Sequence, residues 1–103
     1  MNIVIFITAK DMDEADKIAL ALVQEKLVAC VNIVKGVQSV FKWEGKVDYC
    51  EETLLIAKSE QKLFDKIIKK VKSLHSYSVP EVIALPILEG NPDYLKWIHE
   101  SLR

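Results

Sequence analysis

The sequence predicts a single α+β domain in which two helices alternate with four strands in the order β-α-β-β-α-β, followed by a short C-terminal helix. Three observations predict it. A nearly continuous apolar run occupies Ile3 to Thr8, and a long stretch rich in β-branched and aromatic residues is broken only by the turn at Glu44-Gly45. Two further segments place apolar residues at helical spacing.

The first strand and the first helix have clear local signals. The run Ile3 to Thr8 has no helical gaps, which is typical of a central strand covered on both faces. Asp11 followed by Glu14 forms the pattern of a capping box and predicts a helix over residues 12–26. The apolar stripe of that helix comprises Ala15, Ile18, Ala19, Leu22 and Val23.

The middle of the chain predicts a long β-hairpin. Residues 28–43 and 46–58 form its arms, so that Trp43 pairs near Lys46 and Cys50 lies opposite Ser39. Arms of about 13 residues extend roughly 43 Å, whereas a 100-residue domain has a radius of gyration of about 13 Å. The arms should therefore project beyond their own core.

Projecting arms would expose long apolar edges, and such edges pair readily with another chain. We therefore expect a homo-oligomer in which a neighbouring subunit completes the sheet. Gly36 is expected to form a bulge that bends the first arm around that neighbour.

The last third of the chain predicts a helix, a strand and a helix. Ser59 is expected to cap the second helix, and Pro86 indicates that the strand over residues 82–88 lies at an edge or a bulge. Asn91 as N-cap and Pro92 at the first helical position open the last helix. The buried stripe of the second helix comprises Leu63, Phe64, Ile67, Ile68 and Val71. The complete order is the split βαβ, or ferredoxin-like, arrangement.

Length, net charge and cysteine spacing exclude several classes of function. The 103 residues form one domain, residues 1–103, and a net charge of −1 without a basic stripe argues against nucleic-acid binding. The first apolar run is too short to span a membrane and has no basic leader, so no membrane association and a cytoplasmic location are expected. Cys30 and Cys50 should lie about nine strand residues apart, roughly 30 Å, which excludes a disulfide between them.

His75, Tyr77 and Glu81 form the leading candidate site. Imidazole and carboxylate are good ligands for copper or zinc, and Cys30 is a further candidate ligand through its thiolate. The alternatives are structural. His75 would then cap the second helix, Tyr77 and Glu81 would form hydrogen bonds across an interface, and Cys30 would be a small buried apolar residue.

Further candidates lie on the hairpin. Trp43 flanks its turn, and Glu52 and Lys58 lie on the returning arm, where they are either solvated or inserted between subunits. No Ser-His-Asp, paired-carboxylate, P-loop or GxGxxG pattern is present, so no enzymatic activity is expected. The segment Val37 to Lys42 faintly resembles the substrate loop of acylphosphatases, but it lacks the required arginine and second glycine.

Several short motifs, in order and spacing, resemble the CutA family of divalent-cation tolerance proteins. The family commonly has His-Pro-Tyr where this chain has His75-Ser76-Tyr77, so the loop is expected to be less rigid here. The motifs are Phe6-Ile7-Thr8-Ala9, Lys26 to Asn32, Trp43-Glu44-Gly45-Lys46, Glu52, Lys58, Pro80-Glu81-Val82, Pro86-Ile87 and Tyr94 to Ile98.

The resemblance implies an intertwined homotrimer similar to PII-type signalling proteins, without a known reaction and without an organic cofactor. One hypothesis is a trimer that binds a divalent cation, copper(II) above all, through His75, Glu81 and Cys30. The other is a structural or signalling trimer whose clefts between subunits bind a small ligand or a protein partner that the sequence does not identify. The cleft residues would be Tyr77, Lys58, Glu52 and Trp43.

Overall fold

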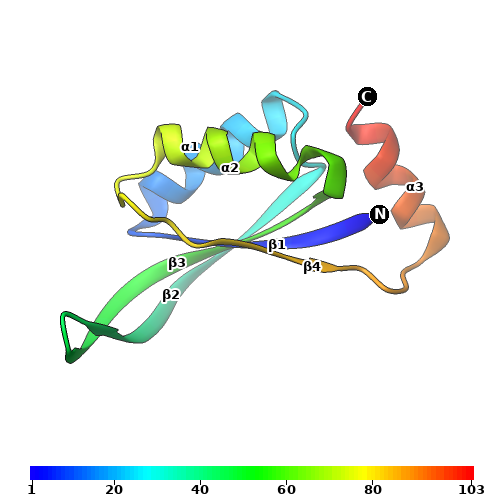
Figure 1. The fold of residues 1–103 in the computed structure, drawn as a ribbon. Helices are drawn as coiled ribbons and strands as arrows, with labels where there is room; N and C mark the ends of the chain where they lie inside the picture. The colour runs from blue at the N-terminus through cyan, green and yellow to red at the C-terminus, as the bar shows by residue number, and fades with distance from the viewer.

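A four-stranded antiparallel sheet with helices on one face forms the body of the molecule (Figure 1). The computed structural model describes all 103 residues. The elements are β1 (Asn2–Ala9), α1 (Met12–Gln24), β2 (Cys30–Trp43), β3 (Lys46–Glu60), the 3-10 turn η1 (Gln61–Leu63), α2 (Phe64–Leu74), β4 (Val82–Pro86) and α3 (Pro92–Ser101).

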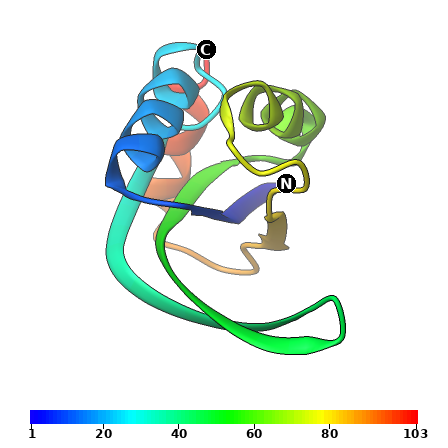
Figure 2. The ribbon, with the colours of Figure 1, turned by 90° about the vertical axis from the view of Figure 1, so that its left-hand side faces the viewer.

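The strands lie in the order β2-β3-β1-β4, and every neighbouring pair is antiparallel. Helices α1 and α2 lie side by side on one face, whereas α3 lies at one end of the sheet, near the N-terminus (Figures 1 and 2). This is the ferredoxin-like arrangement with a long central hairpin and a C-terminal helix, so the predicted α+β fold is confirmed.

The core lies between the sheet and the helix pair. Alternate residues of β1 face the helices and are buried, while the intervening residues, such as Phe6, are half-buried. The expectation that β1 is covered on both faces is therefore wrong for a single chain, because the helices cover only one. The largest buried side chains of the core are Ile5, Ile7, Ile18, Leu22, Leu55, Ile67 and Val71.

The hairpin has the predicted register. Trp43 pairs with Lys46, and Ser39 pairs with Cys50. The register shifts between Val34 and Val37, and Gly36 adopts a φ of +78° there, which confirms the expected bulge. Beyond the bulge the arms project away from the helices and curl beneath the sheet (Figures 1 and 2). Every residue from 41 to 49 is exposed, as the overlong arms predicted.

Several predicted element boundaries are wrong, beginning with the end of α1. Helix α1 ends at Gln24 because Lys26 adopts a left-handed φ of +57°, and the N–H groups of Lys26 and Leu27 donate to Val23 and Leu22. This is a Schellman closure with lysine at the position that favours glycine.

Ser59 does not cap α2. It remains in β3, fully buried, and its hydroxyl donates to the Leu27 carbonyl at 2.6 Å. The turn η1 therefore separates β3 from α2. Strand β2 begins at Cys30, β3 extends to Glu60, and β4 ends at Pro86 on the edge of the sheet.

Helix α3 begins as predicted. The Asn91 side chain accepts a hydrogen bond from the Asp93 N–H at 3.0 Å, and Pro92 occupies the first turn. Ile98 is the buried residue of this helix, and the Nδ1 atom of His99 lies 2.9 Å from the Glu60 carboxylate. That hydrogen bond lowers the pKa of Glu60 and ties α3 to the end of β3.

Candidate functional site

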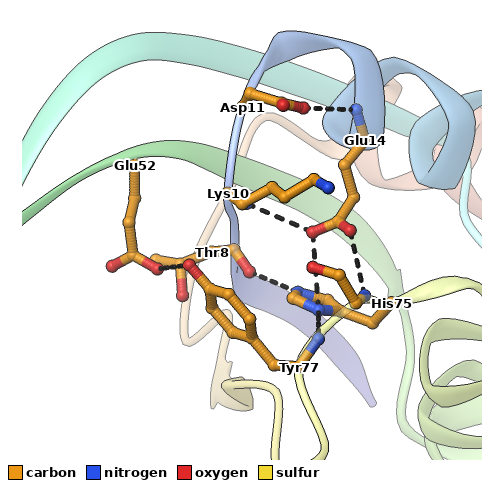
Figure 3. A network of polar contacts seen from close by, with 8 residues as sticks. Thr8, Lys10, Asp11, Glu14, Glu52, His75 and Tyr77 are labelled. Atoms are coloured by element: carbon orange, nitrogen blue, oxygen red, sulfur yellow. Dashed lines mark hydrogen bonds and ion pairs between the residues drawn. The ribbon is translucent and has the colours of Figure 1, made fainter.

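His75 ends helix α2 and joins it to β1 and to the following loop (Figure 3). Its side chain has no exposed surface. Nε2 lies 2.7 Å from the Thr8 carbonyl oxygen, and Nδ1 lies 3.0 Å from the backbone nitrogen of Tyr77. A carbonyl only accepts and an N–H only donates, so the imidazole carries its proton on Nε2 and accepts at Nδ1. Both ring nitrogens are therefore occupied within one chain.

Glu14 supports the same loop from helix α1. Its carboxylate accepts hydrogen bonds from the backbone N–H of Lys10 at 3.2 Å and of Ser76 at 2.9 Å, and it lies 3.5 Å from Nδ1 of His75. Burial raises the pKa of Glu14, but the hydrogen bonds of Ser76 and Lys10 outweigh it, and the pKa is lowered. Glu14 is thus an anionic anchor for the loop.

The hydrogen bonds of Glu14 also differ from those of the capping box predicted at the N-terminus of α1. Asp11 accepts the Glu14 N–H at 2.9 Å, as a capping box requires, but the Glu14 carboxylate bonds to Lys10 and Ser76. A proline at position 76 has no N–H to donate. Ser76 therefore supplies a backbone hydrogen bond that anchors the loop and that a proline at this position could not supply.

The side chain of Tyr77 connects the loop after α2 to the hairpin. Its hydroxyl donates to the Glu52 carboxylate at 2.8 Å, and the Ser39 hydroxyl donates to the other Glu52 oxygen at 2.6 Å. Burial and the hydrogen bond to Glu52 raise the pKa of Tyr77 far above its ordinary value, so the phenol stays protonated and remains a donor. Glu52 forms no ion pair with a lysine, arginine or histidine.

These residues border a cleft of about 760 Å³ between the hairpin and residues 77–81. No lysine, arginine or histidine lines it. Its walls include Ser39, Phe41, Trp43, Glu52, Tyr77 and Glu81. The cleft is therefore anionic, with aromatic and hydroxyl groups on its walls. Trp43, Glu52, Tyr77 and Glu81, which the sequence singled out separately, lie on this one surface.

The other candidates lie elsewhere. Cys30, at the start of β2, has its sulfur 3.4 Å from the Tyr94 hydroxyl, and this contact together with burial raises the pKa of Tyr94 to about 12. Lys58 lies opposite Cys30 and donates to the Asn32 side chain. Both cysteines are free.

The residues predicted as metal ligands do not converge within one chain. His75 is enclosed by its own hydrogen bonds, Glu81 is exposed on the cleft, and Cys30 lies beside α3. No group of three or more His, Cys, Asp or Glu side chains is placed to hold a metal ion. A closed metal site would thus require further ligands from water or a second subunit.

Comparison with known proteins decides the family. The family model described as CutA1 divalent ion tolerance protein matches residues 3–101. The chain belongs to the CutA family. This confirms the resemblance read from the sequence, and the family is one of tolerance proteins and not of enzymes.

Individual CutA proteins are similar over the whole chain. Protein CutA, chloroplastic, from Arabidopsis thaliana is 48% identical over 102 residues, covering 99% of this chain and 56% of that protein. The divalent-cation tolerance protein CutA from Thermus thermophilus is 48% identical over 101 residues, covering 98% of both chains. The chain thus spans little more than half of the Arabidopsis relative but nearly all of the Thermus one.

Solved CutA structures have the same fold. The Thermus thermophilus protein matches with a TM-score of 0.96 at 48% identity, covering 98% of each chain. The protein from Archaeoglobus fulgidus, described as periplasmic, matches with a TM-score of 0.97 at 40% identity, covering 100% of each chain. Since relatives are described as chloroplastic or periplasmic, the cytoplasmic location stays a prediction. None of the helices has the length and apolar character needed to cross a membrane.

Proposed function

We propose that this CutA protein is a non-enzymatic homotrimer that confers divalent-cation tolerance and binds its ligand in the cleft between the hairpin and residues 77–81, at a boundary between subunits. The observation that carries the proposal is the charge of this cleft. Glu52 and Glu81 line it, and no positive side chain does. Such a surface attracts cations.

The trimer is supported by the surface that one chain leaves uncovered. Val47 is 66% exposed and Tyr49 63% at the hairpin tip, and Ile83 of the edge strand β4 is 52% exposed. Burial of these side chains against a neighbouring subunit removes apolar surface from water. Pairing of a neighbouring strand with the hairpin gives the unpaired backbone N–H and C=O groups of its edge hydrogen-bond partners. The number of subunits, three, is what the resemblance to PII-type trimers implies. Light scattering should give three times the mass of one chain.

Copper(II) is the leading divalent cation, because it heads the affinity order of the first-row metals. The ligand set first proposed was His75, Glu81 and Cys30. Of these, Glu81 lies on the cleft, whereas His75 can ligate only after losing a hydrogen bond to Thr8 or Tyr77. We therefore assign the first contacts to Glu81 and Glu52, with water or a neighbouring subunit supplying the rest.

Calorimetric titration of the purified trimer with copper(II) tests this assignment. Glu81→Gln and Glu52→Gln should each weaken binding about tenfold, whereas Glu100→Gln, a matched change on the distant helix α3, should leave it unchanged. If His75→Ala or Cys30→Ser abolishes binding while Glu81→Gln does not, the original ligand set holds instead. Equal weakening in all variants would indicate adventitious surface binding.

The walls of the cleft favour a second candidate function, a PII-like trimer that binds a small organic ligand and affects metal tolerance indirectly. Phe41, Trp43 and Tyr77 contribute aromatic surface that a hydrated metal ion does not use. Lys58 does not line this cleft, and its side chain donates to Asn32 instead. A trimer that binds no divalent cation in the titration above would support this second function.

A further inference from the structure

We propose that the cleft selects an organic ammonium ion, a ligand with a positively charged nitrogen on a compact apolar body. This inference rests on the second candidate function and names the chemical class of its ligand. It follows from three properties of the cleft that occur together: an anionic group held in place without a counter-ion, exposed aromatic side chains in the same lining, and a volume suited to a small molecule.

Glu52 is the fixed anionic group. Hydroxyl groups of Ser39 and Tyr77 donate to its two oxygens at 2.6 and 2.8 Å, which locks the carboxylate in one orientation (Figure 3 shows the Tyr77 contact). These donors are neutral, so they orient the charge without cancelling it. No ion pair reaches Glu52, and Glu81 adds a second carboxylate to the same cleft. The negative charge is thus available to a ligand.

The loop behind the cleft keeps this arrangement in place. Tyr77 can meet Glu52 because its backbone N–H is held by His75, and His75 is held in turn by the Thr8 carbonyl. Glu14 fixes the intervening residue, Ser76, through its N–H. The donor that orients the Glu52 carboxylate is therefore positioned by buried groups, and a ligand does not have to order it on binding.

Aromatic surface lines the same cleft. Trp43 is 64% exposed and Phe41 is 40% exposed, and both line the cleft. An ammonium group is attracted to the face of an aromatic ring, most strongly to tryptophan. Val40 and Val79 provide apolar contact for the body of the ligand. The cleft volume of about 760 Å³ lies within the range of small-molecule sites, about 300–1,000 Å³.

The other ligand classes use fewer of the groups that line the cleft. An anion would be repelled by both carboxylates, and the Tyr77 hydroxyl already donates its hydrogen bond to Glu52, so it is not free to donate to an anion. A neutral apolar molecule would use Trp43 and Phe41 but would leave the carboxylates without a partner. A hydrated divalent ion would use the carboxylates alone. An organic ammonium ion is the class that uses both the carboxylates and the aromatic side chains of the cleft.

Three probes with the same apolar body and different head groups test the inference. 3,3-Dimethylbutylammonium, 3,3-dimethylbutan-1-ol and 3,3-dimethylbutanoate are titrated at pH 7 into the 103-residue protein, and binding is followed by calorimetry and by backbone amide shifts. The ammonium probe should bind at least tenfold more tightly than the alcohol, and the carboxylate probe should not bind. Shifts should concentrate on residues 39–43 and 77–81.

Matched variants locate the effect. Glu52→Gln and Trp43→Leu should each weaken binding of the ammonium probe about tenfold. Glu100→Gln and Trp97→Leu make the same chemical changes on helix α3 and should leave binding unchanged. Light scattering on each variant verifies that the oligomer is intact, so that loss of binding is not mistaken for loss of assembly.

The outcomes separate this inference from the proposed function. Equal affinity for the ammonium probe and the alcohol overturns it, as does equal weakening by the cleft and α3 variants. If copper(II) binds through Glu52 and Glu81 but the ammonium probe does not bind, this inference fails and the divalent-cation function stands. If neither binds to an intact trimer, both fail.

Discussion

Replacement of His75 by alanine tests whether this imidazole holds the loop after α2 in position. The side chain is fully buried and forms hydrogen bonds with the Thr8 carbonyl and the Tyr77 N–H. Alanine removes both bonds and leaves a cavity the size of the ring. The loop that presents Tyr77 to Glu52 then loses its main support.

The magnitude follows from these contacts. Each hydrogen bond contributes about 0.5–1.5 kcal/mol net, and a buried donor left without an acceptor costs about 1–3 kcal/mol. Since the Thr8 carbonyl lies in a paired strand, whereas the Tyr77 N–H loses its acceptor, we expect His75→Ala to reduce the free energy of unfolding by about 2–4 kcal/mol per subunit. His99→Ala is the control, because His99 is 47% exposed and its ion pair with Glu60 contributes about 1 kcal/mol or less.

Denaturant unfolding followed by circular dichroism measures the difference. The protein is held at one subunit concentration, since association contributes to apparent stability, and a chelator excludes any effect of bound metal. A loss below about 0.5 kcal/mol, or one equal to that of His99→Ala, would refute a structural role for the ring. If His75→Ala leaves the free energy of unfolding unchanged but abolishes copper binding, His75 is a metal ligand and not a structural residue.

Further predictions concern assembly, pH and backbone conformation. The unfolding midpoint should rise with protein concentration, and a midpoint independent of concentration would argue against the trimer. The pKa of Glu14 in the folded protein lies below its ordinary value of 4.5. The ionised Glu14 therefore contributes stability above pH 4.5, and this contribution is lost as the pH falls through the lowered pKa. In Glu14→Gln, the free energy of unfolding should decline less steeply over this acid range. Gly36→Ala should cost about 1 kcal/mol, since φ is +78° and nothing blocks the added methyl group, whereas Lys26→Gly, which relieves a φ of +57°, should stabilise by a similar amount in thermal unfolding. Ser76→Pro should lower stability because it deletes the N–H that Glu14 binds, and no change in denaturant unfolding would contradict that anchor.

The fold was largely predictable because its signals are local. Asp11 and Asn91 cap their helices through their own side chains, and the bulge at Gly36 needs only a residue that tolerates a positive φ. The predicted start of α2 at Ser59 was wrong because the role of this residue depends on a distant contact. Ser59 has the chemistry of a helix cap, but its hydroxyl donates to the Leu27 carbonyl, 32 residues away along the chain.

The site was predictable in its residue types and only partly in its arrangement. Alternation along the hairpin places Ser39 opposite Cys50, but it does not show that the Ser39 and Tyr77 hydroxyls meet on Glu52. That meeting depends on how the loop after α2 packs against the sheet. Glu14 was recognised as a capping residue, and its bond to Ser76 was missed for the same reason.

His75 shows what separates a ligand from a structural histidine. The residue type and the neighbouring Glu81 favoured a metal site, but a ring nitrogen binds a metal only if no other group uses its lone pair. Here the Tyr77 N–H uses the lone pair of Nδ1, and the Thr8 carbonyl keeps the proton on Nε2. The imidazole therefore serves the cleft indirectly. It holds Tyr77 on Glu52 and leaves cation recognition to the carboxylates.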